Sequence, residues 1–163
     1  MRTSEMWLLR LFQWAAHASV FAMLRNSKWG FAAVEMVHLL ALAVLGGTVL
    51  IVDLGILGIG LRKQAPSRVA RELSPLFLGS LTAMAISGTL LVAAEAMKCY
   101  YHPAFRLKML LFALALLFHF TIHRNAVRTP DDAKPPIWSK LAAAVSLTLW
   151  LGVGLAGRAI GFL

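Results

Sequence analysis

Hydrophobic residues form four long runs along the chain, separated by short segments rich in basic residues and proline. The runs cover about residues 31–61, 75–97, 104–124 and 137–160. A helix needs about 20 apolar residues to cross the hydrocarbon core of a bilayer, and each run is long enough to do so. We therefore predict a single all-α membrane domain over residues 1–163, built as an integral membrane four-helix bundle.

The segment before the first run has a different pattern. Residues 4–25 carry Arg10, Gln13 and His17 on one helical stripe, with apolar and tryptophan side chains around the rest of the helix. A helix with one polar face and tryptophans on the other favours the headgroup region over a span. We predict an N-terminal amphipathic helix that lies along one membrane interface.

Composition and charge agree with membrane insertion. The chain is 60% hydrophobic and 14% charged, whereas soluble domains average about 45–50% apolar and about 25% charged residues. The formal net charge is +9, and most basic residues lie between the apolar runs, where they meet anionic lipid headgroups. Since the chain has no soluble domain with a basic face, we exclude nucleic acid as a partner and expect a multi-pass protein in the lipid bilayer.

The third run contains ionisable residues on one face. Lys108 and His119 are eleven positions apart, or about 20° around a helix, and His119 and His123 differ by about 40°. Ala115 lies between them on the same face and leaves room for a flat ligand or a neighbouring helix. Ionisable groups at membrane depth mark cofactor sites or proton paths. The alternative is that His119 and His123 only hydrogen-bond neighbours near the membrane edge.

The first run contains a second group of polar residues. Glu35 precedes His38 by three positions, so its carboxylate could orient the imidazole, as carboxylates do for metal-bound histidine. Asp53 lies about 60° around the helix from His38. For Asp53 we expect pairing with a loop arginine such as Arg62 or Arg124.

Neutral imidazole inside a helix bundle is a good ligand for haem iron. We expect haem b ligated by His38, with His119 as the favoured second residue. If the helices are not staggered, His38 sits about 10 Å higher than His119. Lys108 and His102 are therefore the alternatives on the His38 side, and His123 is the alternative on the opposite side.

Soft ligands offer a different chemistry. Cys99 is the only cysteine, which excludes an intrachain disulfide and cysteine-based zinc or iron–sulfur sites. Copper handling is an alternative because soft ligands recur at Met36, Met84, Met97, Met109, Cys99 and His102. Methionine in an apolar helix is far more often a packing residue.

Two of these motifs carry a resemblance to a known family. His38 in VHLLALAVLGG, with Phe105-Arg106-Leu107-Lys108 and His119 further on, resembles the haem-containing membrane protoporphyrinogen oxidases of bacteria. Those are small four-helix proteins with an essential histidine in an early span and a lysine that opens a later one. The resemblance implies a haem site in the bacterial inner (cytoplasmic) membrane. This chain has an added N-terminal helix and lacks much of the oxidase pattern.

Other stretches resemble two further families. SGTLLVAAEAMKCYYHPAFRLKML is similar to the membrane domain of CopD-type copper-resistance proteins. NSKWGFAAVEMVHLL, VDLGILG and AFRLKMLLFALAL are similar to an uncharacterised bacterial family over nearly the whole chain.

These patterns lead to one expected function and two alternatives. We expect a b-type haem protein in electron transfer or oxidoreduction, with protoporphyrinogen oxidation as its specific enzymatic version. The alternatives are a copper-handling membrane protein and a cofactor-free accessory subunit of a larger membrane complex. Gly157 and Gly161 form a GxxxG pair, which suits a homo-oligomer or such a complex but equally suits packing within the bundle.

Overall fold

The computed structural model describes residues 2–59, 64–127 and 136–159, and every regular element in these ranges is a helix. The order is α1 (Arg2–His17), α2 (Ser19–Asn26), α3 (Lys28–Leu57), α4 (Pro66–Ala94), α5 (Ala96–Tyr101), α6 (Pro103–Phe118), the π-helical segment η1 (His119–His123), α7 (Arg124–Ala126) and α8 (Ile137–Ala159). The predicted all-α class is confirmed.

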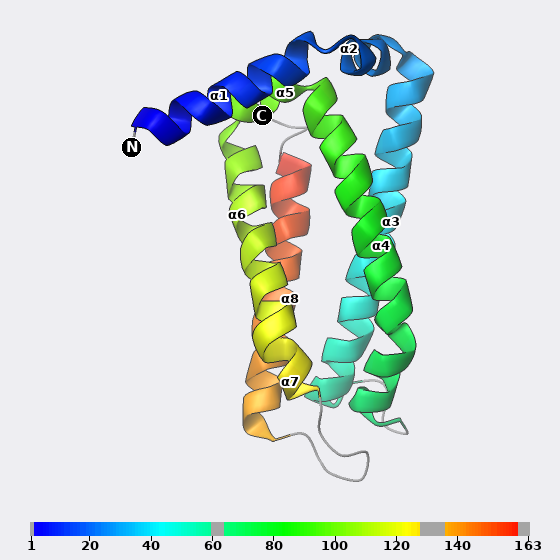
Figure 1. Ribbon diagram of the computed structural model, residues 1–163. Coiled ribbons are helices and arrows are strands. Elements are labelled where there is room, and N and C mark those ends of the chain that lie inside the picture. Colours follow the sequence, from blue (N-terminus) through cyan, green and yellow to red (C-terminus); the bar gives the residue numbers. More distant parts are fainter. Residues whose placement is uncertain (1, 60–63, 128–135, 160–163) are drawn as a thin grey trace.

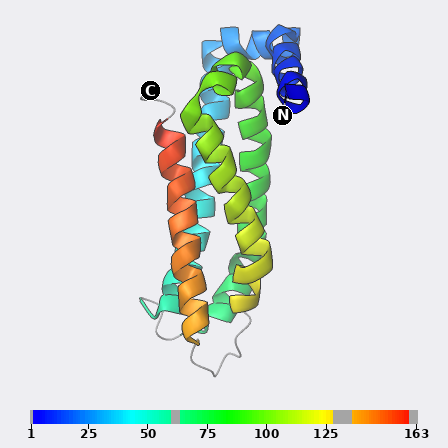
Figure 2. The same cartoon turned by 90° about the vertical axis from the view of Figure 1, so that its left-hand side faces the viewer.

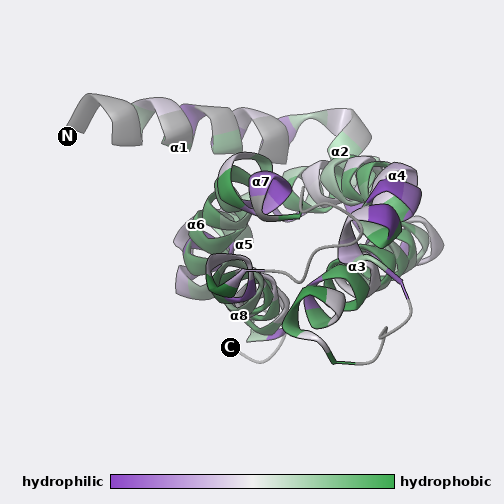
Figure 3. Cartoon of the chain, turned by 90° about the horizontal axis from the view of Figure 1, so that it is seen from below, coloured by the Kyte–Doolittle hydropathy of each residue, from purple (hydrophilic) through white to green (hydrophobic). Residues whose placement is uncertain are grey.

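Four helical segments among the described residues are long and apolar enough to cross a membrane, namely α3, α4, α6 with η1, and α8. They run side by side as a bundle, as Figure 1 and, after a quarter turn, Figure 2 show. Helix α3 packs against α4 and α8, and α6 packs against α8. Along the described residues, the backbones of α4 and α6 stay farther apart than those of α3 and α4 or of α6 and α8. The four spans make the chain a multi-pass membrane protein. The ring of helices is loosest between α4 and α6 (Figure 3).

The N-terminal segment lies across the end of the bundle, as an interfacial helix would (Figure 1). It is two helices rather than the single predicted one, because Ala18 has extended backbone angles between α1 and α2. Phe12 of α1 packs against Tyr100 of α5, with ring centroids 5.4 Å apart. Arg25 of α2 donates a hydrogen bond of 3.2 Å to the carbonyl oxygen of Ala94. These contacts fix the transverse helices to the end of the bundle.

The second spanning helix begins earlier than expected. We predicted a start near Pro75, but α4 begins at Pro66, which occupies the first turn, where its missing N–H costs nothing. Pro75 lies inside the helix. It removes one intrahelical hydrogen bond there without ending the helix. The first spanning helix also begins slightly early, at Lys28, where the Ser27 hydroxyl accepts a 3.1 Å hydrogen bond from the backbone of Gly30.

The middle of the bundle is filled by apolar side chains from all four spanning helices. The central cluster comprises Ala41, Leu45, Val49, Phe77, Met84, Ala115, Trp150 and Val153. A smaller cluster beyond it contains Val52, Ile56, Val69 and Ala143. The ionisable side chains of the spanning helices lie toward the two ends of the bundle, on either side of this cluster, whereas the polar residues buried beside it are uncharged, namely Thr48, Ser80 and Ser146.

Candidate functional site

The first polar group lies in the half of the bundle nearer to α1 and centres on His38. Its Nδ1 atom is 3.0 Å from the hydroxyl oxygen of Ser87 on α4. That hydroxyl donates its proton to the carbonyl oxygen of Ala83, 2.6 Å away. The Ser87 oxygen is then left to accept a hydrogen bond from Nδ1–H of His38. In this arrangement the Nε2 atom of His38 carries the lone pair of the ring.

Gly88 makes room for this imidazole. A Cβ atom at position 88 would lie 3.0 Å from Cε1 and 3.5 Å from Nδ1 of His38. The first distance is tighter than most side-chain contacts, so the ring would have to move by a few tenths of an ångström to admit a side chain there. On the same helix, a Cβ atom at Gly79 would meet nothing within 4 Å.

Lys108 reaches the same half of the bundle from α6. Its side chain lies along α8, where a Cβ atom at Gly157 would be 3.4 Å from Cε and 3.5 Å from Nζ of the lysine. The absence of a side chain at Gly157 therefore leaves room for Lys108 against α8. Gly161, the other glycine of the GxxxG pair, lies outside the described residues. The lysine is close enough to His38 for their charges to interact. We call His38, Ser87, Gly88, Lys108 and Gly157 the His38 cluster.

Other residues predicted near His38 have different surroundings. Glu35 is exposed, and no hydrogen bond joins it to His38 among the described residues. The Nδ1 atom of His102, which precedes α6, is buried without a hydrogen-bond partner. Burial, with Glu95 nearby, raises the pKa of the Cys99 thiol. The thiolate that a copper site would use is therefore disfavoured at Cys99.

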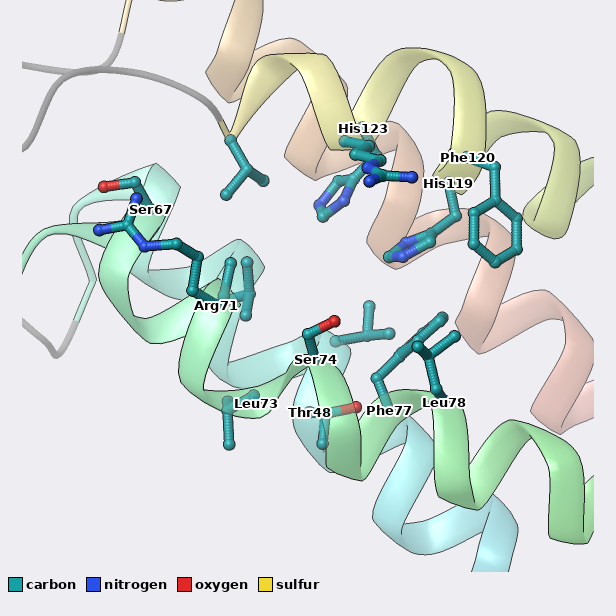
Figure 4. Close-up of a pocket in the computed structure, with 15 residues that line it drawn as sticks. Thr48, Ser67, Arg71, Leu73, Ser74, Phe77, Leu78, His119, Phe120 and His123 are labelled. Atoms are coloured by element: carbon teal, nitrogen blue, oxygen red, sulfur yellow. The ribbon is translucent and has the colours of Figure 1, made fainter.

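The second polar group lines a cavity of about 500 Å³ in the other half of the bundle. Its walls come from α3, α4, η1, α7 and Val127, and they are mostly apolar. The polar residues at its edge include His119, His123, Arg71 and Arg124. Figure 4 shows both imidazoles pointing from η1 into the space between η1 and α4. We call this space the His119 cavity.

Asp53 and His123 form a buried pair at the wall of the cavity. The Nε2 atom of His123 lies 2.5 Å from Oδ1 of Asp53, and both side chains are at most 3% exposed. The expected partners of Asp53 were Arg62, which is outside the described residues, and Arg124; the structure pairs the carboxylate with His123 instead. The second carboxylate oxygen of Asp53 is buried without a hydrogen-bond partner.

His119 is held by ring stacking. It stacks on Phe77 of α4, with centroids 4.2 Å apart and ring planes 18° apart. On its other side the His123 ring is 5.0 Å away at 23°. The Nδ1 atom of His119 is buried without a hydrogen-bond partner. Both histidines belong to the π-helical segment η1, and such segments are frequent at functional sites.

The structure does not bring His38 and His119 together. His38 contacts α4 at Ser87, whereas His119 contacts it at Phe77. These positions are ten residues apart on one helix, which at 1.5 Å per residue is about 15 Å. The central apolar cluster, including Met84, lies between them. The structure instead groups His38 with Lys108, and His119 with His123.

One family model matches the chain over residues 11–163, and it describes a family of unknown function, DUF6644. The chain belongs to this family. No curated protein and no solved structure matches the chain.

Sequence reasoning missed the residues of this DUF6644 member that position its histidines. Ser87 and Gly88 open the stretch that is similar to CopD-type proteins, but neither was predicted to contact His38. Phe77 reads as one apolar residue among many. The only signal for Ser87 was its place in a spanning segment, where a hydroxyl hydrogen-bonds either to a carbonyl of its own helix or to a side chain of a neighbouring helix. Nothing local distinguished Phe77.

Proposed function

We propose that this DUF6644 chain is a b-type haem protein of the bacterial inner membrane, acting in electron transfer or oxidoreduction, with His38 as an iron ligand. The observation that carries the proposal is the hydrogen bond between His38 Nδ1–H and Ser87. Metal-bound histidines are usually oriented by donating their other ring N–H in this way. The imidazole of His38 is therefore in the tautomer whose Nε2 lone pair can bind haem iron.

Lys108 is the second residue of the proposed site. Its cation lies within electrostatic reach of His38 and is seated against Gly157. Lys108 would help to hold the haem, either by neutralising a propionate or as a second iron ligand, and His102 is the alternative to Lys108 in the second of these roles. When bound, haem would supply one-electron chemistry, and the chain would supply the ligand, the counter-charge and exclusion of water.

Protoporphyrinogen oxidation is the narrower version of this proposal. It rests on the resemblance of the His38 and Phe105–Lys108 stretches to the bacterial membrane oxidases. An oxidase would consume a porphyrinogen and reduce an electron acceptor, so purified protein should accelerate porphyrin formation. Activity that survives in the Lys108→Ala variant would argue against this version while leaving haem binding intact.

The test of haem binding is the absorbance spectrum of protein purified in detergent from cells supplied with a haem precursor. We expect a Soret band in the unaltered chain and its loss in His38→Ala, with normal expression because alanine suits a helix. His17→Ala, which changes an exposed histidine of α1, is the matched control and should keep the band.

Three other outcomes would contradict the assignment. Loss of the band in His119→Ala but not in His38→Ala would transfer the haem to the His119 cavity. Copper without iron in metal analysis would favour the copper-handling alternative. Absence of both metals and of the band would favour an accessory subunit of a larger membrane complex.

A further inference from the structure

The His119 cavity is separate from the proposed haem site and has its own chemistry. Its volume of about 500 Å³ falls within the range of roughly 300–1,000 Å³ that is typical of small-molecule sites. His38 is not among its lining residues. The described lining includes Arg71 and Arg124 but no acidic side chain. The nearby Asp53 is engaged by His123.

Charge and polarity change along the cavity in one direction. Arg71 on α4 and Arg124 on α7 lie toward the end of the bundle, and Figure 3 shows hydrophilic residues at that end of both helices. Leu78 and Phe120 lie toward the membrane centre. Arg71 and Leu78 are seven residues apart, or about 10 Å along α4. The cavity is therefore cationic near the membrane surface and apolar at greater depth.

The cavity also opens sideways. The backbones of α4 and α6 stay apart along the described residues, although Phe77 of α4 stacks on His119 of η1. Lining residues on both sides of this gap are exposed, with Leu78 at 47% and Phe120 at 46%. A molecule dissolved in the bilayer would reach the cavity through this opening without crossing water.

We propose that the His119 cavity binds one membrane-resident acid, a molecule with a phosphate or carboxylate head and a long apolar chain. The head lies beside Arg124, and the chain runs along Phe77, Leu78 and Phe120. Guanidinium groups bind such oxyanions through paired hydrogen bonds. A lipid phosphodiester and a fatty-acid carboxylate both offer this chemistry, and they differ in size and charge.

The experiment titrates the purified full-length chain in neutral detergent with oleate and, separately, with phosphatidylglycerol. Native mass spectrometry counts the molecules bound, and monoolein and phosphatidylcholine serve as probes without net charge. We expect saturable binding of one acid per chain, weakened about tenfold in Arg124→Gln, the size expected for loss of a charge-assisted hydrogen bond. The control, Arg68→Gln, removes an arginine that pairs with Glu72 outside the cavity and should bind normally.

Binding of oleate alone identifies a carboxylate site, and binding of phosphatidylglycerol alone identifies a phosphodiester site. Equal binding of the probes without net charge, or equal weakening in Arg68→Gln, would reduce the effect to ordinary lipid contact and overturn the proposal. If Arg124→Gln does not fold, Ala70→Leu tests the same site by filling the cavity. Its control is Ala85→Leu, at an exposed position of the same helix. Unchanged binding in Ala70→Leu would also overturn the proposal.

Discussion

At the scale of single residues, the serine hydroxyl at position 87 controls the chemistry of His38. A hydroxyl has one proton and two lone pairs, and Ser87 gives its proton to Ala83 within its own helix. Because that proton goes to Ala83, the Nδ1 atom of His38 donates its own proton to the Ser87 oxygen. A backbone carbonyl on one helix thereby determines which nitrogen of an imidazole on another helix is free.

Gly88 offers a test of this arrangement that removes no ligand atom. In Gly88→Ala the added methyl group would lie 3.0 Å from Cε1 of His38, so the ring must shift by a few tenths of an ångström. We expect a weakened or displaced Soret band in absorbance spectra of the purified variant. Gly79→Ala, on the same helix, meets nothing within 4 Å and should leave the spectrum unchanged. Identical spectra for the two variants would show that the position of the His38 ring does not matter to haem.

At the scale of helices, the Asp53–His123 pair joins α3 to the π-helical segment η1. Both groups are buried, and the carboxylate has no other hydrogen-bond partner among the described residues. Asp53→Ala leaves the buried Nε2 atom of His123 without its hydrogen-bond partner. We expect a loss of about 1–3 kcal/mol in unfolding free energy, the penalty of an unpaired buried polar group. Denaturation of the purified protein in detergent, followed by circular dichroism, measures it.

The matched control is Glu72→Ala, which breaks the exposed pair between Glu72 and Arg68 on α4. Exposed pairs at this helical spacing contribute only about 0.3–0.5 kcal/mol. A loss in Asp53→Ala no larger than in Glu72→Ala would mean that the buried pair does not stabilise the contact between α3 and η1.

At the scale of the whole molecule, an even number of spans places both ends of the chain on one side of the membrane. Basic residues are denser at the end of the bundle formed by about residues 62–74 and 124–137, so we predict that this end faces the cytoplasm. In a Cys99→Ser background, Lys140→Cys should react with a membrane-impermeant thiol reagent only after cells are opened. Gln13→Cys, on the exposed face of α1, should react in intact cells once the outer membrane is permeabilised. The reverse pattern would invert the topology.

The spans themselves were predictable, because each needs only enough consecutive apolar residues to cross the bilayer and no partner. The error at Pro75 has a local reason: proline is a reliable signal for a helix boundary in water, but tertiary packing can carry a helix through it. The split of the N-terminal helix at Ala18 has no comparable signal in the sequence.

The sequence by itself determined four apolar spans, a transverse amphipathic segment and the set of ionisable residues placed at membrane depth. The tertiary structure decided which partners they have: His38 contacts Ser87 and lies within electrostatic reach of Lys108, and His123 contacts Asp53. Periodicity gives the angle between residues on one helix but not the rotation and height of that helix against its neighbours. Those are set by close packing of residues such as Leu45 and Ala115, and by a π-helical turn that helical periodicity does not reveal.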